Sequence, residues 1–176
     1  MKDHEPRRFR HATMQDLPHM ERIYEQARAL MARNGNPTQW GTQFPKPEVV
    51  RDDIANQRTI LLTDHLGEQG SERILAQFAL CPGVDPAYGH IEGAWLDNDP
   101  YVTIHRIASA GLVRHAARDC INWAVQHYGN VRADTHPNNK AMQHVLEGCG
   151  FARCGLIQVV DRPVDTTRIA YQRHAW

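Results

Sequence analysis

Asp134-Thr-His-Pro-Asn-Asn-Lys-Ala-Met-Gln-His-Val-Leu-Glu-Gly-Cys-Gly-Phe151 predicts three elements in immediate succession. The β-branched run Val131–Thr135 favours a strand that ends as this stretch begins. Asn138 or Asn139 then caps a helix, because an asparagine side chain accepts hydrogen bonds from the free N–H groups of a first turn. The helix ends at Gly150-Phe151, which turns directly into another strand. We therefore expect a strand, a capped helix and a strand here.

The chain just before this stretch predicts a second strand–turn–helix unit. Residues 101–108, Tyr-Val-Thr-Ile-His-Arg-Ile-Ala, carry the β-branched content typical of a central strand. The turn Ser109-Ala110-Gly111 follows, and a helix is expected to begin at about Val113 and to end near Tyr128-Gly129. The spacing of Val113, Ala116, Cys120, Ala124 and His127 predicts this helix.

The remaining patterns predict the outer elements of an α/β fold. One helix follows a cap at Asp16 and stops at Asn34-Gly35, and a shorter one begins near Pro47. The outer strands are expected at residues 7–13, 59–63, 73–80, 151–160 and 167–173. Residues 82–100 show no sustained hydrophobic periodicity, which predicts a long loop. Loops of this length are uncommon unless they are functional. The order of elements predicts a single α/β domain over residues 1–176, with a mixed central sheet.

Composition excludes several classes of protein. The 176 residues include 20 Lys+Arg and 20 Asp+Glu, a balance that argues against a nucleic-acid partner. No apolar run reaches the 18 residues that would predict a membrane helix, and no secretory leader is recognisable, so we expect no membrane partner. The four cysteines form no Cys-x-x-Cys pair, which favours reduced thiols in a cytoplasmic protein.

Basic residues gather where the helix after Gly111 is expected to start. The N-terminus of a helix carries a partial positive charge, so Arg114, His115 and Arg118 are unfavourable there unless an anion lies among them. A phosphate-bearing ligand is the natural anion. The alternative is that these are solvated surface charges, partly offset by Asp119.

Taken together, these patterns resemble the GNAT superfamily of N-acetyltransferases. The resemblance rests on the strand–turn–helix with its anion-binding character and on Asn139-Lys-Ala-Met followed by Gly150-Phe151. Tyr101–Ser109 and Asp134-Thr-His make the sequence similar to a group of bacterial GNAT proteins. The resemblance implies a GNAT-like acyl-CoA N-acyltransferase fold, with helices on both faces of the sheet and acetyl-coenzyme A in a V-shaped opening between the two central strands.

The resemblance also implies where acetyl-coenzyme A binds. The pantetheine arm would pair with the strand backbone, the pyrophosphate would lie on the following loop and helix N-terminus, and the asparagine of the last helix would lie nearby. The residues so implied are Arg106, Ile107, Ala108, Leu112, Val113, Arg114, His115, Ala116, Ala117, Arg118 and Asn139.

Three positions depart from the pattern of the family. Its phosphate loop, Gln/Arg-x-x-Gly-x-Gly/Ala, corresponds here to Leu112, His115 and Ala117, of which only Ala117 agrees. A glycine allows close backbone approach, whereas the Cβ of His115 could crowd a phosphate or its imidazole could bind one. The tyrosine that often serves as general acid corresponds to Leu146, which cannot donate a proton.

The candidates for proton transfer and for the acceptor pocket come from the strands and loops. His105 is the first candidate for a general base, because histidine exchanges protons near neutral pH; the alternative is a core histidine bonded to a carbonyl. Glu92, Asp134 and His136 are weaker candidates, and the alternative for each is a loop contact or a cap. Trp40, Trp95, Asp134 and His136 are expected to line the acceptor pocket. The histidines and cysteines show no metal-ligand spacing, so no metal is expected.

The predicted function is transfer of an acetyl group from acetyl-coenzyme A to an amine by direct attack. The acceptor would be a small-molecule or peptide amine, and a homodimer is possible. The alternative is an acyl-CoA-binding or ligand-sensing module on the same fold with weak or no catalysis. Leu112, His115 and Leu146 favour that alternative, whereas Asn139 and the arginines at the helix start favour cofactor binding.

Overall fold

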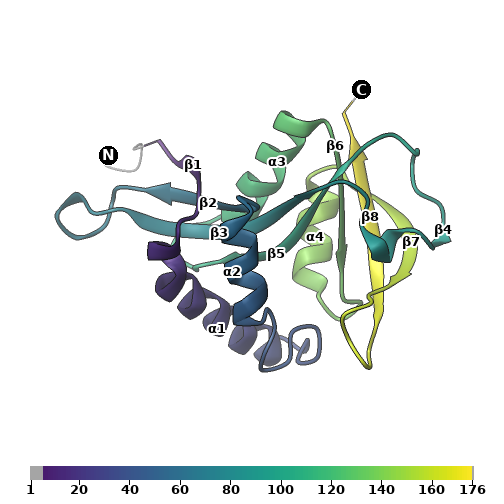
Figure 1. Ribbon diagram of the computed structural model, residues 1–176, viewed down its shortest axis with the longest axis horizontal. Helices are drawn as coiled ribbons and strands as arrows, with labels where there is room; N and C mark the ends of the chain where they lie inside the picture. Colours follow the sequence, from purple (N-terminus) through teal and green to yellow (C-terminus); the bar gives the residue numbers. More distant parts are fainter. Residues whose placement is uncertain (1–5, 176) are drawn as a thin grey trace.

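One mixed sheet of eight strands organises the protein. The computed structural model describes residues 6–175, so the first five residues and the last of the predicted domain lie outside the description. The strands are β1 (Arg8–His11), β2 (Thr59–Asp64), β3 (Arg73–Pro82), β4 (Glu92–Gly93), β5 (Val102–Ser109), β6 (Asn130–Thr135), β7 (Ala152–Gln158) and β8 (Thr167–His174). Their order across the sheet is β1-β2-β3-β5-β6-β8-β7-β4 (Figure 1).

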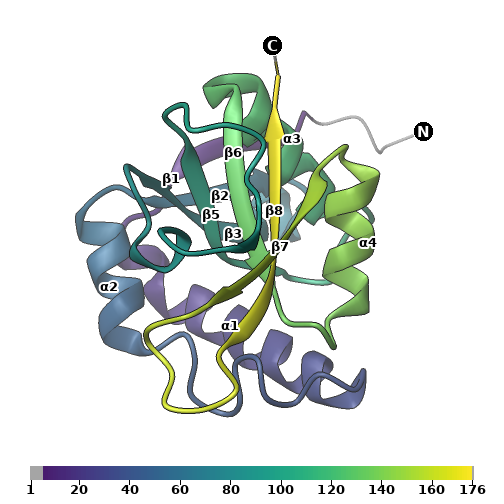
Figure 2. The same cartoon turned by 90° about the vertical axis from the view of Figure 1, so that its right-hand side faces the viewer.

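Helices cover both faces of this sheet, as expected. They are α1 (Leu17–Arg33), α2 (Pro47–Ala55), α3 (Ala116–Tyr128) and α4 (Lys140–Gly148). Short 3-10 turns, η1 (Met14–Asp16), η2 (Glu68–Gly70) and η3 (Pro86–Tyr88), lie in the connections. α1 and α2 pack against one face through Leu61, Ile74 and Ala108. α3 and α4 pack against the other face over Ile60, Leu62 and Phe78, and Figures 1 and 2 show this division.

The α/β fold predicted from the sequence is confirmed, with two differences. A two-residue strand, β4, forms within the segment expected to be a loop, because Glu92 and Gly93 pair with Leu156 and Gly155 at the edge of β7. α3 begins at Ala116 rather than near Val113. The reason lies in the loop before α3 and is described with the site below.

The sheet opens between its two central strands. β5 and β6 run parallel but pair only at Val102–Val131 and Thr103–Arg132. Beyond these pairs the strands separate, and in Figure 1 β6 and β8 stand almost upright while β2 and β3 run across the molecule. The opening leaves the end of β5 without a strand neighbour on the β6 side.

A bulge in β5 lies where the strands separate. Ala79 of β3 faces His105 and Gln77 faces Ala108, so Arg106 and Ile107 together face only Phe78. Arg106 has a left-handed backbone with φ of +54°. An extra residue of this kind bends a strand and increases its twist. The bulge therefore turns the end of β5 away from β6.

Buried partners hold the bulge in this conformation. The Tyr24 hydroxyl of α1 donates to the Arg106 carbonyl at 2.9 Å. The Arg106 side chain forms a two-pronged ion pair with Asp53 of α2, with Nε–Oδ2 and Nη2–Oδ1 distances of 2.7 and 2.9 Å. Asp53 is 2% exposed and also accepts from Nε of Arg58 at 3.0 Å. One carboxylate thus connects α2, the start of β2 and the bulge.

We expect Asp53→Asn to lower the free energy of unfolding by on the order of 3 kcal/mol, because two guanidinium groups lose a buried counter-charge. Asp52→Asn is the matched control: Asp52 also pairs with Arg58 but is exposed, so its loss should cost less than about 1 kcal/mol. Urea denaturation measures both values. Equal losses in the two variants would contradict the role given to Asp53.

Candidate functional site

A cleft of about 890 Å³ occupies the opening between β5 and β6. Its walls come from the α1–α2 loop, the end of β3, β5, α3, β6, α4 and the β7–β8 loop. It brings together eight of the residues predicted from the sequence. They are Trp40, His105, Arg106, Ile107, Ala108, Ala117, Asp134 and Asn139.

The loop between β5 and α3 explains why the helix starts late. His115 adopts a left-handed backbone, with φ of +64°, and serves as the N-cap of α3. A helix needs negative φ, so Val113, Arg114 and His115 belong to the loop and Ala116 is the first helical residue. His115 stands where the resemblance has a glycine, and glycine adopts this conformation at little cost.

Two basic side chains lie beside this helix start. Among residues 6–175, neither Arg114 nor Arg118 has a carboxylate within ion-pair distance, and the Nε atom of Arg118 is buried without a hydrogen-bond partner. Asp119, in the first turn of α3, pairs with Arg7, whose other terminal nitrogen donates to the Arg114 carbonyl at 3.4 Å. The start of α3 therefore retains a positive character. Leu112 is half exposed and contributes no charge.

His115→Gly should raise the free energy of unfolding by about 1 kcal/mol, because it removes the Cβ that makes a left-handed conformation unfavourable. His115→Ala is the matched control, since it removes the imidazole but keeps the Cβ, and we expect no gain from it. Thermal and urea unfolding of the three proteins test this. A stabilisation shared by both variants would show that the ring, and not the backbone conformation, carries the strain.

His105 forms a close pair with an aspartate that sequence analysis missed. Its Nε2 atom lies 2.6 Å from Oδ2 of Asp85, in the loop between β3 and η3. Asp85 Oδ1 accepts from the backbone N–H of Ala87 at 2.9 Å and so caps η3. Burial, the largest single influence, tends to raise the pKa of Asp85, but the contact with His105, the N–H of Ala87 and the charge of Arg106 together outweigh it and lower the pKa. Asp85 is therefore ionised near neutral pH.

The contact with Asp85 determines which nitrogen of the His105 ring carries the proton. Because the ionised Asp85 only accepts hydrogen bonds, Nε2 of His105 carries the proton of that contact. No hydrogen-bond partner for Nδ1 is found among the described residues, and His105 lines the cleft. In the neutral ring Nδ1 is then an unprotonated acceptor. The sequence signal for Asp85 was its place directly before Pro86, which is typical of an N-cap; the same carboxylate also binds His105.

Asp134 faces the same cleft through a second short contact. The hydroxyl of Tyr88, a buried residue of η3, donates to Oδ2 of Asp134 at 2.6 Å. Burial and the charge of Asp134 raise the pKa of Tyr88 well above its usual value, so its hydroxyl stays protonated. The ring of Tyr88 also lies 6.3 Å from the ring of His105. Asp134 and His105 are thus neighbours of one buried tyrosine.

Two buried hydroxyl groups in the cleft have no protein partner. Oγ1 of Thr103, at the last β5–β6 pair, and Oγ1 of Thr135, at the end of β6, make no hydrogen bond within residues 6–175. Both residues are fully buried and line the cleft. Buried polar atoms are normally satisfied, so these two indicate an opening built for a ligand with polar groups.

Asn139 caps α4, which settles the alternative left open by the sequence. Its Oδ1 accepts from the N–H of Met142 at 3.1 Å, while its Nδ2 donates to Oε1 of Gln39 at 3.0 Å. The amide thereby joins α4 to the α1–α2 loop at the edge of the cleft. Leu146, on the same helix, is buried and presents an apolar side chain to the cleft.

Nine of the predicted residues do not line the cleft. Six of them, Leu112 to Ala116 and Arg118, belong to the loop and helix start just described, and three, Glu92, Trp95 and His136, lie elsewhere. Glu92 is exposed on β4 and borders a separate hollow of about 300 Å³. Trp95 donates from Nε1 to the Tyr88 carbonyl at 3.1 Å and packs on the guanidinium of Arg132, 4.0 Å from its ring centre. Neither residue lines the cleft, and we do not place them in the proposed site.

His136, the third of these residues, braces two loops. Its Nδ1 accepts from the backbone N–H of Asn138 at 2.9 Å, so the ring proton lies on Nε2. Nε2 donates to Asp165 of the β7–β8 loop at 2.8 Å. With both nitrogens engaged and the side chain 6% exposed, His136 holds the loop beside α4.

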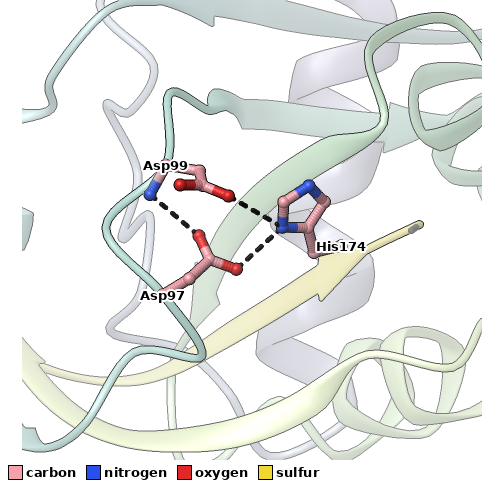
Figure 3. Close-up of side chains that lie close together, drawn as sticks. All are labelled: Asp97, Asp99 and His174. Atoms are coloured by element: carbon pink, nitrogen blue, oxygen red, sulfur yellow. Dashed lines mark hydrogen bonds and ion pairs between the residues drawn. The ribbon is translucent and has the colours of Figure 1, made fainter.

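One group of side chains within residues 6–175 has the composition of a metal site. Asp97, Asp99 and His174 lie at the C-terminal end of β8, outside the cleft (Figure 3). Nδ1 of His174 is 2.8 Å from Asp97 and 3.8 Å from Asp99. Asp97 also accepts from the N–H of Asp99 and from Asn130. These contacts account for the cluster as an ion pair between the loop and β8.

Across the described residues, no helix is both long and apolar enough to cross a membrane. No protein-family model matches the sequence, and no curated protein matches it. Solved structures do match, over almost the whole chain. An acetyltransferase of the GNAT family from Streptococcus agalactiae 2603 is 28% identical, with a TM-score of 0.82, and the match covers 97% of this chain and 96% of that one.

More distant structures have the same fold. An acetyltransferase of the GNAT family from Listeria monocytogenes 4b F2365 is 15% identical, covers 96% of this chain and 94% of that one, and has a TM-score of 0.66. NAA60 from Arabidopsis thaliana in complex with acetyl-CoA is 12% identical, with coverages of 96% and 99% and a TM-score of 0.67.

The eight-stranded sheet, split beside a bulged strand and entered by a deep cleft, places the protein in the class of α/β acyltransferase folds. Within that class it has the GNAT fold over its whole length, and the resemblance to the GNAT superfamily predicted from the sequence is confirmed. The similarity supports acyl transfer as the general class of activity.

Proposed function

We propose that this protein transfers an acetyl group from acetyl-coenzyme A to an amine by direct attack, with His105 as the general base. The observation that carries the proposal is the Asp85–His105 pair, which engages Nε2 and leaves Nδ1 of this cleft-lining residue without a partner among the described residues. A base positioned there can take the proton that an amine must lose as it is acylated. Asp85 orients the ring and is a positioning residue.

The cleft fits acetyl-coenzyme A in two respects. The buried hydroxyls of Thr103 and Thr135 lack partners, as expected where a polar chain inserts between the strands. The start of α3 combines free N–H groups with Arg114 and Arg118, which suits a pyrophosphate. NAA60, which has the same fold, was crystallised with acetyl-CoA. When bound, acetyl-coenzyme A supplies the thioester from which the acetyl group comes.

The residues proposed to hold it fall into three groups. Arg106, Ile107 and Ala108 present the unpaired side of β5 to the pantetheine arm. The loop and helix start, Leu112 to Ala117 with Arg118, face the pyrophosphate. Asn139 positions the start of α4 at the other wall of the cleft.

The same geometry leaves a second function to distinguish. Leu146 is a buried apolar side chain where the resemblance has a proton-donating tyrosine, so the departing thiolate takes its proton from solvent. This residue favours an acyl-CoA-binding module with little turnover. That alternative keeps coenzyme binding but predicts no amine acetylation. The homodimer suggested by the sequence remains a prediction.

The test is a titration of coenzyme A by calorimetry, followed by a thiol-release assay over a panel of amines. We expect binding to the wild type and turnover with at least one amine. His105→Ala should lower kcat by on the order of 10²–10⁴ and leave coenzyme A affinity within a few-fold, since the ring moves a proton but does not hold the coenzyme. Asp85→Asn should lower kcat similarly, because its amide would move the ring proton to Nδ1.

Glu92→Gln provides the comparison. Glu92 is another candidate for the general base from the sequence, but it lies outside the cleft. It should keep wild-type turnover. Coenzyme A binding without turnover on any amine would favour the alternative module. Wild-type turnover in His105→Ala, with a loss in Glu92→Gln, would overturn the assignment of the base.

A further inference from the structure

Arg168 is a buried cation that faces the cleft without a counter-ion. It is 2% exposed and lies on β8, where the strand extends beyond its last pair with β6. Nη1 donates to the carbonyls of Asp165 and Thr167 at 2.6 and 2.9 Å. Among residues 6–175, no carboxylate lies within ion-pair distance, and neither Nε nor Nη2 makes a hydrogen bond.

The other arginines in the cleft are paired, which makes Arg168 distinct. Arg106 and Arg58 share Asp53, and Arg162 pairs with Asp161 at 2.8 Å. A buried charge is costly to desolvate unless a partner compensates for it. Burial lowers the pKa of Arg168, and the charges of Asp134, Asp165 and Asp161 offset this shift only in part. An anion within ion-pair distance would therefore stabilise the buried guanidinium.

Arg168 lies on the same face of the sheet as the proposed base. Side chains alternate along a strand, so Arg168 shares a face with Ala170, which packs against Tyr88. Tyr88 bonds to Asp134 and lies beside His105. The charge of Asp134 acts on Arg168 as well, although the two groups form no ion pair. His105, Asp134 and Arg168 thus surround one region of the cleft, on the α1–α2 face.

The charges in this region match a small zwitterion. Asp134 uses Oδ2 to accept from Tyr88, and no described residue bonds to its Oδ1, which can therefore receive an ammonium group. Arg168 has Nε and Nη2 free for a carboxylate, which such a fork binds in two-pronged fashion. A single unpaired guanidinium in a region that already holds the carboxylates of Asp134, Asp161 and Asp165 favours one negative charge over a dianion such as phosphate.

We propose that the acceptor is a primary amine that also carries a carboxylate, as a free α-amino acid does. Arg168 holds the carboxylate and Asp134 receives the ammonium group, which places the nitrogen beside Nδ1 of His105. The inference rests on the proposed function and names its substrate class. Arg168 acts as a specificity residue and takes no part in proton transfer.

Calorimetry tests the inference independently of turnover. Free L-amino acids and their C-terminal amides are titrated into the protein, with and without coenzyme A. We expect at least one free acid to bind at least tenfold more tightly than its amide, and Arg168→Gln to abolish this preference. Affinity for the amide should change less than threefold in the variant, because the amide makes no ion pair with Arg168.

Arg162→Gln is the matched control, since it removes a cation from the same cleft that already has Asp161 as its partner. It should keep the preference for the free acid. If no free acid binds better than its amide, or if Arg168→Gln weakens both ligands equally, the inference is wrong. If Arg168→Gln does not fold, the affinities of the wild type for the free acids and for their amides still test the inference. Tight binding of a free acid without acetylation of any amine would instead overturn the proposed function and leave the anion site standing.

Discussion

The two-pronged ion pair between Arg106 and Asp53 is the contact on which the rest of the arrangement depends. It anchors a left-handed residue in the middle of a strand, a conformation that a non-glycine side chain adopts only where its surroundings impose it. The bulge bends β5, and a bent β5 cannot continue its pairing with β6 beyond Thr103. The cleft exists because these two strands separate. A buried carboxylate on α2 thereby sets the geometry of a site formed mostly by other elements.

The cleft has two chemically different parts. Toward α3 and α4 it is lined by Ala117 and by apolar side chains such as Leu146, next to a helix start with unpaired arginines. On the α1–α2 face it contains the Asp85–His105 pair, Asp134 and the unpaired Arg168. The first part suits a long polyanion with a flexible arm, and the second suits a small charged amine. They meet where β5 and β6 diverge, as transfer between two ligands requires.

Local patterns in the sequence predicted the fold almost completely, because amphipathic periodicity and caps depend on neighbouring residues. They also located β5 and Asn139, which is both cap and cleft residue, but they placed the start of α3 near Val113 because the left-handed backbone of His115 has no sequence signal. They could not reveal Asp85, which meets His105 across 20 positions, or the absence of a partner for Arg168. Such features exist only once distant segments are packed. His136 and Trp95 show the converse: their residue types suggested function, but packing engages them in structural contacts.

A crystal structure of the protein with coenzyme A tests the account most directly. We predict that the pantetheine arm lies between β5 and β6, with its amides within hydrogen-bond distance of β5 residues 106–108, and that the pyrophosphate lies against residues 112–117. The Arg106–Asp53 pair and the bulge should be unchanged. Coenzyme A bound outside the cleft, or β5 and β6 paired continuously beyond Thr103 with the opening closed, would contradict it.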